Sequence, residues 1–259
     1  MATQPLQVSL RFYEELNDLL PAEKQKVEFV HRYKQTGSIK DLVESLGVPH
    51  TEIDLILVNG RSVDFHYQVQ NGDRISVYPV FESLDISPLT RLRPRPLRDP
   101  RFVLDAHLGR LAAYLRMLGF DALYRNDYDD PTLAGISVEQ RRILLTCDRK
   151  LLMRKQITHG YFVRSRHPHE QLREVVTRLD LRNNLRPFSR CMHCNGMIRP
   201  VAKALIQDQL LPHTRAHQEV FGQCDRCRKI YWKGTHYQQM QRLIGWLTAG
   251  PVPHPPDSG

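Results

Sequence analysis

The sequence predicts an α/β protein with a parallel sheet in its central part. Two short apolar runs, at residues 102–104 and 143–145, suit strands that are buried on both faces. Between them apolar side chains recur at helical spacing, namely at Leu108, Leu111, Ala112, Leu115 and Leu118. The predicted order is therefore strand, helix, loop, strand. A chain of 259 residues is also long enough for two or three domains with cores of their own.

A carboxylate follows each of the two predicted strands. Asp105 comes directly after the first run, and Asp148 lies three residues past the second. In open α/β sheets, ligands bind beyond the carboxyl ends of the strands, where both side chains are expected. Two carboxylates held close together repel each other, and a bound divalent cation commonly offsets this repulsion. The two aspartates are therefore candidate metal ligands.

The N-terminal part, residues 5–85, alternates strand and helix signals. Leu6, Val8 and Leu10 alternate as in a half-buried strand, and Ser38 is a candidate cap for a helix up to Leu46. Residues 53–58 and 74–80 are predicted strands, with the Asn-Gly turn signals at 59–60 and 71–72 between them. This pattern predicts a small mixed sheet with one helix.

Charge is distributed unevenly along the chain. Residues 1–85 hold 8 Lys and Arg against 13 Asp and Glu, whereas residues 86–259 hold 29 against 15. A basic part of this kind favours a polyanionic partner such as RNA, although an arginine-rich surface that is merely solvated has the same composition. The sequence has neither an 18-residue apolar run nor a signal peptide pattern, so we expect a soluble, cytoplasmic protein with no membrane partner.

Two CxxC pairs predict a structural zinc site. Cys191 and Cys194 are separated by 29 residues from Cys224 and Cys227, and four thiolates close a tetrahedral zinc site with no open position for catalysis. The long interval predicts an inserted helix around residues 201–211. Four histidines are alternative ligands, namely His193, His213, His217 and His236. The fifth cysteine, Cys147, is predicted to be a small buried residue at a strand end.

An aromatic and basic cluster follows the last CxxC pair. It comprises Tyr231, Trp232, Lys233 and His236. Such a mixture stacks unpaired bases and follows phosphates, so these residues are candidate RNA contacts. The alternative is that the two aromatic rings pack against the zinc module.

The linker and the ends of the chain complete the predicted organisation. Residues 87–100 interleave four prolines with four arginines, a composition that forbids a helix and indicates a domain boundary. The arginines either contact RNA phosphate or are only solvated. The predicted domains are 1–86, 101–186 and 187–240, followed by a partly disordered tail at 241–259.

The N-terminal part resembles the ubiquitin-like β-grasp proteins of the sulfur-carrier type, over residues 46–82 (LGVPHTEIDLILVNGRSVDFHYQVQNGDRISVYPVFE). Those carriers act through a free C-terminal Gly-Gly. Here the segment continues through Phe81, Glu82 and Ser83 into the linker. The sequence therefore argues against a sulfur-transfer role, and we expect a module that docks a protein or a ribonucleoprotein.

The central and C-terminal parts resemble the Mut7-C domain, which is assigned to the PIN-like nucleases. The resemblance rests on residues 102–105 (FVLD), 108–112 (LGRLA), 115–121 (LRMLGFD), 144–152 (LLTCDRKLL) and the tail 229–236. It implies RNA cleavage with Mg²⁺ or Mn²⁺ held by three or four acidic residues. Asp105 and Asp148 match the family's acids. The third ligand is open among Asp121, Asp127, Asp129, Asp130 and Glu139, and we favour Asp121 with Asp129 or Asp130, because the loop after the first helix is expected at the same edge of the sheet.

One departure from the family pattern concerns a further acid. The predicted strand at 161–166 is followed by no carboxylate before Glu170, so Ser165 or Glu170 is the candidate substitute. The cations near the centre, Arg110, Arg116, Arg149 and Lys150, are expected to grip the RNA backbone or to pair with the acidic loop at 127–130. The sequence thus predicts a metal-dependent ribonuclease with a zinc ribbon; the alternative is a non-catalytic RNA-binding or ribosome-associated adaptor.

Overall fold

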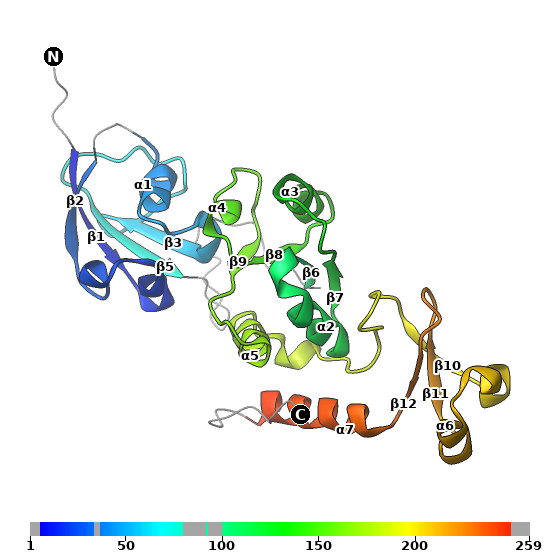
Figure 1. The fold of residues 1–259 in the computed structure, drawn as a ribbon. Coiled ribbons are helices and arrows are strands. Elements are labelled where there is room, and N and C mark those ends of the chain that lie inside the picture. Colours follow the sequence, from blue (N-terminus) through cyan, green and yellow to red (C-terminus); the bar gives the residue numbers. More distant parts are fainter. Residues whose placement is uncertain (1–5, 34–36, 80–91, 93–99, 250–259) are drawn as a thin grey trace. The chain divides into compact units, whose positions relative to one another are not determined.

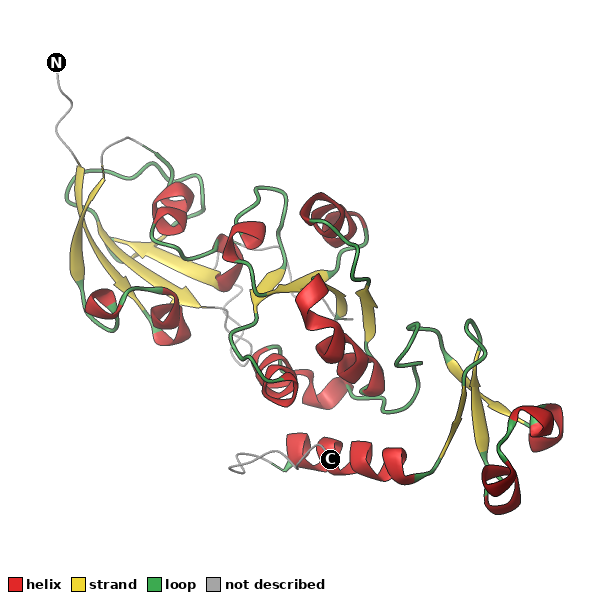
Figure 2. Ribbon diagram, in the orientation of Figure 1, coloured by secondary structure: helices red, strands yellow, loops and turns green. Residues whose placement is uncertain are grey.

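The computed structural model describes residues 6–33, 37–79, 92 and 100–249. The chain divides into two compact units: Met1–Asp99 with Asp129–Phe162, and Pro100–Tyr128 with Val163–Gly259. Figure 1 follows the chain from one end to the other, and Figure 2 shows its helices and strands. Apart from Pro100 and Leu92, the predicted linker lies outside the described residues.

The first unit contains a five-stranded sheet with the order β2-β1-β5-β3-β4. Its elements are β1 (Leu6–Phe12), β2 (Phe29–Tyr33), α1 (Ile39–Ser45), β3 (Ile53–Val58), β4 (Arg61–Ser62) and β5 (Arg74–Pro79). The two central strands, β1 and β5, are parallel, and the other pairs are antiparallel. The predicted mixed sheet with one helix is confirmed.

Local sequence signals account for this sheet and its helix. Val8, Leu10 and Phe12 alternate along β1 and are each at most 1% exposed. Ser38 begins α1 with a capping box, in which its hydroxyl accepts the Asp41 N–H while the Asp41 carboxylate accepts the Ser38 N–H. The helix then turns Ile39, Leu42 and Val43 into the core.

The first unit also contains α3 (Asp130–Glu139), β8 (Ile143–Thr146), α4 (Arg149–Leu152) and β9 (Gly160–Phe162). The strands β8 and β9 are parallel. Two buried side chains of the 3-10 helix η3 (His50–Glu52) tie this segment to the N-terminal sheet. The carboxylate of Glu52 accepts the Phe162 N–H at 2.7 Å, and the His50 ring bonds the Ile157 carbonyl at 2.7 Å. The tie is therefore made of two polar contacts from buried side chains.

The second unit contains β6 (Arg101–Leu104), α2 (Gly109–Met117), β7 (Asp121–Tyr124) and α5 (Pro168–Arg178). The strands β6 and β7 are parallel, with Arg101 opposite Asp121 and Leu104 opposite Tyr124. Apolar side chains of β6 and α2 are completely buried, including Leu111 and Leu115. The strand predicted at 102–104 is therefore present in a parallel pair, whereas its partner β7 lies where the sequence predicted a loop.

The C-terminal part of the second unit is an antiparallel sheet with the order β10-β11-β12, formed by β10 (Ile198–Val201), β11 (Phe221–Cys224) and β12 (Ile230–Trp232). The helix predicted at 201–211 is wrong in its position. Two 3-10 turns (Lys203–Leu205 and Gln207–Gln209) occupy that stretch, and α6 (Pro212–His217) starts only where Pro212 supplies a helical first residue.

The last helix, α7 (Thr235–Thr248), runs across the boundary predicted at residue 240. It buries Leu243, Trp246 and Leu247, so residues 241–248 of the predicted tail are helical, and residues 250–259 lie outside the described part. Among the helices of the described residues, none is both long enough and apolar enough to cross a membrane.

Candidate metal centre and nucleic-acid interface

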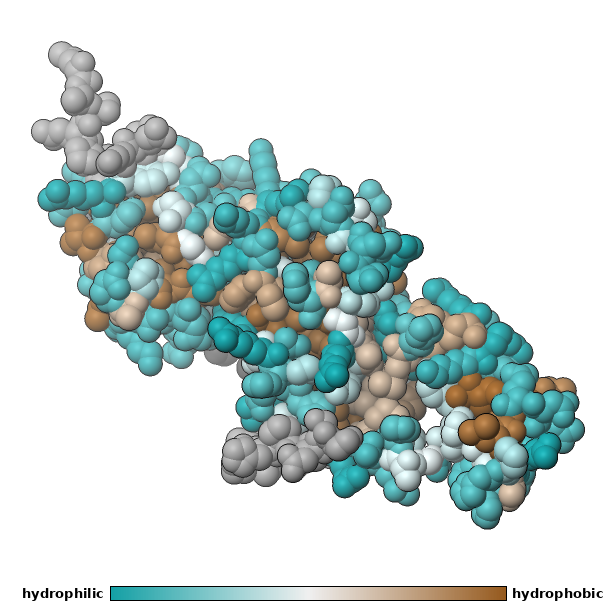
Figure 3. Space-filling model, in the orientation of Figure 1, coloured by the Kyte–Doolittle hydropathy of each residue, from teal (hydrophilic) through white to brown (hydrophobic). Residues whose placement is uncertain are grey.

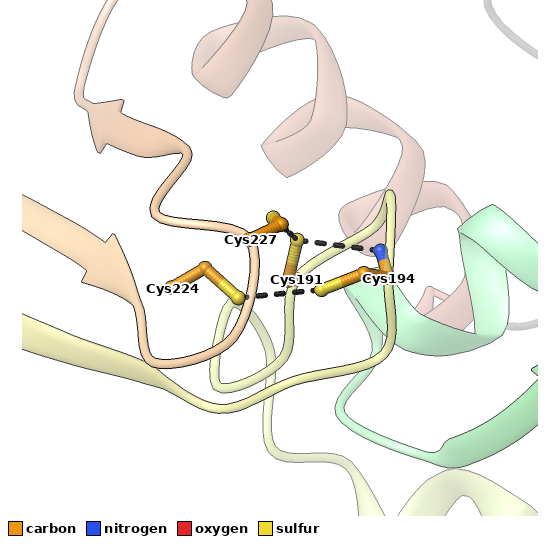
Figure 4. A group of neighbouring side chains, drawn as sticks. All are labelled: Cys191, Cys194, Cys224 and Cys227. Atoms are coloured by element: carbon orange, nitrogen blue, oxygen red, sulfur yellow. Dashed lines mark hydrogen bonds between the residues drawn. The ribbon is translucent and has the colours of Figure 1, made fainter.

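Four cysteine sulfurs converge between the loop before β10 and the turn that joins β11 to β12. The Sγ atoms of Cys191, Cys194, Cys224 and Cys227 all lie within 4.8 Å of one another (Figure 4). Cys191 lies 3.5 Å from Cys227, and Cys194 lies 3.4 Å from Cys224, measured between sulfurs. The ligand group among the described residues is thus made of cysteines alone, without the alternative histidines.

The two cysteine turns have the same local geometry. The N–H of Cys191 donates to the Gly196 carbonyl at 2.8 Å, and the N–H of Cys224 donates to the Lys229 carbonyl at 2.9 Å, both five residues ahead. The residue after the second cysteine of each pair, Asn195 or Arg228, is left-handed, with φ of 67° and 61°. Each CxxC segment therefore folds locally into a tight turn that presents two thiols.

Close approach of the two turns requires a glycine at position 196. A Cβ atom added there would lie 2.8 Å from the Cys224 sulfur and 2.7 Å from the Asp225 carboxylate. The turn that contains Cys224 and Cys227 therefore occupies the space that a side chain at position 196 would need.

The donor set fits Zn²⁺, because four thiolates at one point suit a tetrahedral, soft-ligand site. Burial raises the pKa of the Cys194 thiol, but the Gly196 N–H and the neighbouring thiols outweigh it and hold that pKa at about 7. Burial raises the pKa of Cys227 to about 12 in the absence of a cation. The Tyr231 hydroxyl lies 3.0 Å from the Cys191 sulfur, where it can donate to a thiolate.

A buried polar cluster joins the first cysteine turn to α2 and β7. The guanidinium of Arg116, a side chain on α2 that is 5% exposed, donates to the carbonyls of Ala122 at 2.8 Å, Met192 at 3.1 Å and His193 at 2.9 Å. Arg116 was predicted as an RNA contact. Its donors are instead directed into the protein, so its role is to hold the zinc-ribbon turn in place.

Asp121, predicted as a metal ligand, belongs to the same cluster. Its carboxylate accepts the Asn195 amide at 2.8 Å and lies 3.7 Å from the Arg190 guanidinium. Asp121 begins β7 opposite Arg101, whereas Asp105 follows the other end of β6. The chain direction therefore puts the two carboxylates at opposite ends of the parallel pair, and we leave Asp121 out of the candidate ligand set.

Asp105 and Asp148 each end a parallel strand and cap the helix that follows. The Asp105 carboxylate accepts the His107 N–H at 2.9 Å at the start of the 3-10 helix η4 (Ala106–Leu108), and its residue is 7% exposed. The Asp148 carboxylate accepts the Lys150 N–H at 2.8 Å at the start of α4 and is exposed. Asp105 belongs to the second unit and Asp148 to the first. Both occupy the carboxyl ends of their strands, as predicted.

The acidic loop after β7 contains three further aspartates. Asp129 caps α3 by accepting the Thr132 N–H at 2.9 Å, and hydrogen bonds from the Thr132 side chain and then from this N–H lower the pKa of Asp129. Asp130 lies 3.3 Å from the Arg154 guanidinium. Asp127 pairs with Arg125 at 2.6 Å on the surface. Asp129 thus repeats the capping arrangement of the two strand-end aspartates.

The segment after β9 holds a carboxylate that sequence reasoning missed. Glu174 on α5 accepts the N–H groups of Arg164 and Ser165, each at 2.8 Å. Glu170, the predicted substitute acid, pairs with Arg173 at 2.5 Å. Glu174 lies nine residues after Ser165 and ten after Arg164. This spacing belongs to no recognised sequence motif, so no signal in the sequence indicates the contact.

The predicted basic contacts divide into engaged and exposed side chains. The Arg149 guanidinium donates to the Leu19 carbonyl at 2.9 Å and lies 5.0 Å from the centre of the Phe162 ring, so it holds the first unit together. Arg110 and Lys150 are exposed, as are Lys233 and His236. Trp232 is 40% exposed, so this ring is not packed inside the zinc ribbon, which was the alternative. Cys147, predicted to be buried, is exposed because it lies just past the end of β8.

Comparison with known families agrees with this architecture. Residues 100–244, more than half of the chain, match the model of the Mut7-C RNAse domain. The chain belongs to the Mut7-C RNAse domain family. Residues 6–85 match the Mut7-C ubiquitin domain, which covers the five-stranded sheet of the first unit. A search among curated proteins found no match. The Mut7-C match includes the strand-end aspartates and all four clustered cysteines.

Proposed function

We propose that the protein is a metal-dependent ribonuclease of the Mut7-C type, with Asp105 and Asp148 as ligands of Mg²⁺ or Mn²⁺ and a zinc ribbon that assists RNA binding. The observation that carries the proposal is the placement of these two aspartates within the matched family domain. Each follows the carboxyl end of a parallel strand and is oriented by the backbone N–H two residues ahead. Hard oxygen ligands of this kind suit Mg²⁺ and Mn²⁺.

The roles of the individual residues follow from their positions. When bound, the divalent cation supplies an activated water and neutralises charge on the phosphate. The capping hydrogen bonds hold the Asp105 and Asp148 carboxylates in one orientation. Asp129, which caps α3 in the same way, is the third ligand that we propose. Arg110 and Lys150, both exposed, are the proposed contacts to RNA phosphate.

A cleavage assay tests this proposal. Purified protein is incubated with a pool of structured and single-stranded RNA in Mn²⁺, beside Asp105→Asn, Asp148→Asn and the double variant. We expect cleavage by the wild type and a loss of at least about 100-fold in each single variant and in the double variant, because an amide is a poor replacement for a carboxylate ligand of Mg²⁺ or Mn²⁺. The matched control is Asp127→Asn, which changes a surface aspartate that pairs with the neighbouring Arg125, and it is expected to keep full activity. Cleavage that survives in the double variant would contradict the proposal.

The alternative function is an RNA-binding adaptor without cleavage. It is favoured by one observation, that the exposed Trp232, Lys233 and His236 lie together where β12 leads into α7, away from the strand-end aspartates in the chain. RNA binding by the wild type without cleavage in Mg²⁺ or Mn²⁺ would favour this adaptor over the nuclease.

A further inference from the structure

The second unit contains a cavity of about 490 Å³, lined by side chains from α2, α5, β12 and α7. Tyr114 comes from α2, His169 from α5, Tyr231 and Trp232 from β12, and Tyr237 from α7. In the chain, α2 lies more than a hundred residues before β12 and α7, and none of the lining residues is one of the strand-end aspartates. The volume falls within the range of about 300–1,000 Å³ typical of small-ligand sites.

The aromatic walls of this cavity are held in place by contacts with neighbouring residues. The Tyr237 ring packs against Phe188, with 4.5 Å between ring centres, and the Tyr231 hydroxyl is bonded to the Cys191 sulfur. Trp232 lies against the turn into α7, where a Cβ at Gly234 would come within 3.0 Å of the indole nitrogen. A planar ligand would therefore meet rings that are already oriented, which lowers the entropy cost of binding.

The charge of the lining is neutral or positive throughout. Lys229 and Arg242 contribute cations, and the residues that line the cavity include no aspartate or glutamate. Burial, followed by the charge of Arg110, lowers the pKa of His169, and the Tyr114 hydroxyl lies 2.9 Å from its Nε2. His169 is thus a neutral hydrogen-bonding group near pH 7. Aromatic rings beside cations are complementary to a flat base that carries a phosphate.

We propose that this cavity binds one unpaired nucleobase of an RNA strand by stacking on Trp232, with the adjacent phosphate held by Lys229 and Arg242. The proposal rests on RNA being the substrate, and it deepens that function by assigning the strand an anchoring point on the zinc-ribbon side of the second unit. It also implies a preference for unpaired RNA over a duplex, because a base within a helix cannot enter the cavity.

The test compares two RNA strands that differ only in their bases. One is a fluorescein-labelled hexa-adenylate, and the other has the same backbone with abasic positions, so that both carry the same phosphates. Binding to the full-length zinc-loaded protein is measured by fluorescence anisotropy at one salt concentration, without added Mg²⁺ or Mn²⁺. The variants are Trp232→Ala and, as a matched control, Leu205→Ala, which removes another exposed apolar side chain of the zinc ribbon outside the cavity.

We expect the wild type and Leu205→Ala to bind hexa-adenylate more tightly than the abasic strand. Trp232→Ala should weaken hexa-adenylate binding by about 5- to 150-fold, the effect of removing one stacking ring, and leave binding of the abasic strand unchanged. Equal affinity of the wild type for the two strands would overturn the proposal, and so would a Trp232→Ala variant that binds hexa-adenylate as tightly as the wild type or loses affinity for both strands equally.

Failure of this site can be distinguished from failure of the nuclease function. Base-dependent binding without cleavage would keep the cavity and remove the nuclease. Cleavage that depends on Asp105 and Asp148, together with indifference to the Trp232 change, would keep the nuclease and remove the cavity as a base site.

Discussion

Replacing Arg116 by methionine is expected to destabilise the second unit, because it removes the buried guanidinium that joins α2 to the first cysteine turn. Nε and Nη1 of Arg116 together bond three carbonyls at 2.8–3.1 Å. Methionine retains much of the apolar stem but donates no hydrogen bond. Two charged donor groups at about 1.5 kcal/mol each predict a loss of about 3 kcal/mol in the free energy of unfolding.

Urea denaturation followed by tryptophan emission measures this loss, since both tryptophans of the chain, Trp232 and Trp246, belong to the second unit. With a slope of about 2 kcal/mol per molar urea, the midpoint should fall by about 1.5 M. Two of the carbonyls that lose their donor, those of Met192 and His193, lie within the first CxxC turn. Zinc should therefore also pass faster to a chelator.

The matched control is Arg110→Met, the same change at an exposed position of the same helix. Its unfolding free energy should stay within about 0.5 kcal/mol of the wild type. If Arg116→Met lowers the midpoint no more than Arg110→Met does, the guanidinium does not hold the ribbon and the reasoning is refuted.

Three further predictions concern the zinc site, the first unit and pH. The wild type should contain one zinc per chain by elemental analysis and Cys224→Ser substantially less, because an alcohol is a poor substitute for a thiolate ligand; unchanged zinc content would exclude the four-cysteine site. Glu52→Ala should reduce stability by about 1–3 kcal/mol, measured by urea unfolding, because it removes the buried carboxylate that accepts the Phe162 N–H of β9, whereas Glu23→Ala at an exposed position should have no measurable effect. Burial, followed by the charge of Arg110, lowers the pKa of His169 in the folded state, so the unfolded chain binds more protons and stability should fall as pH drops below about 6.5. His169→Gln should flatten this dependence in unfolding curves from about pH 7.5 to 5, and an unchanged dependence would contradict the prediction.

Much of the fold could be predicted because its signals are local. The capping box at Ser38, the alternation along β1 and the two CxxC turns depend on contacts within a few residues, so spacing in the chain determines their geometry. The positions of Asp105 and Asp148 at strand ends follow from the same kind of pattern.

The assignments that changed were those that depend on partners far away in the chain. Arg116 and Asp121 have the residue types of a nuclease site, but their partners are 74 to 77 residues ahead, in the first cysteine turn. Nothing near them in the sequence marks that pairing. In the same way, no periodicity brings Tyr114 and His169 to one cavity with Trp232.

The sequence by itself determined the classes of structure in this protein: a mixed N-terminal sheet, parallel strands that end on aspartates, and a four-cysteine module. Each depends on side-chain periodicity or on turns of a few residues, which the backbone converts directly into geometry. Only the tertiary structure decided which charged residues are buried in the packing and which face solvent. That choice depends on desolvation, because a guanidinium or carboxylate is buried only where packing brings enough hydrogen-bonding partners to it from distant parts of the chain.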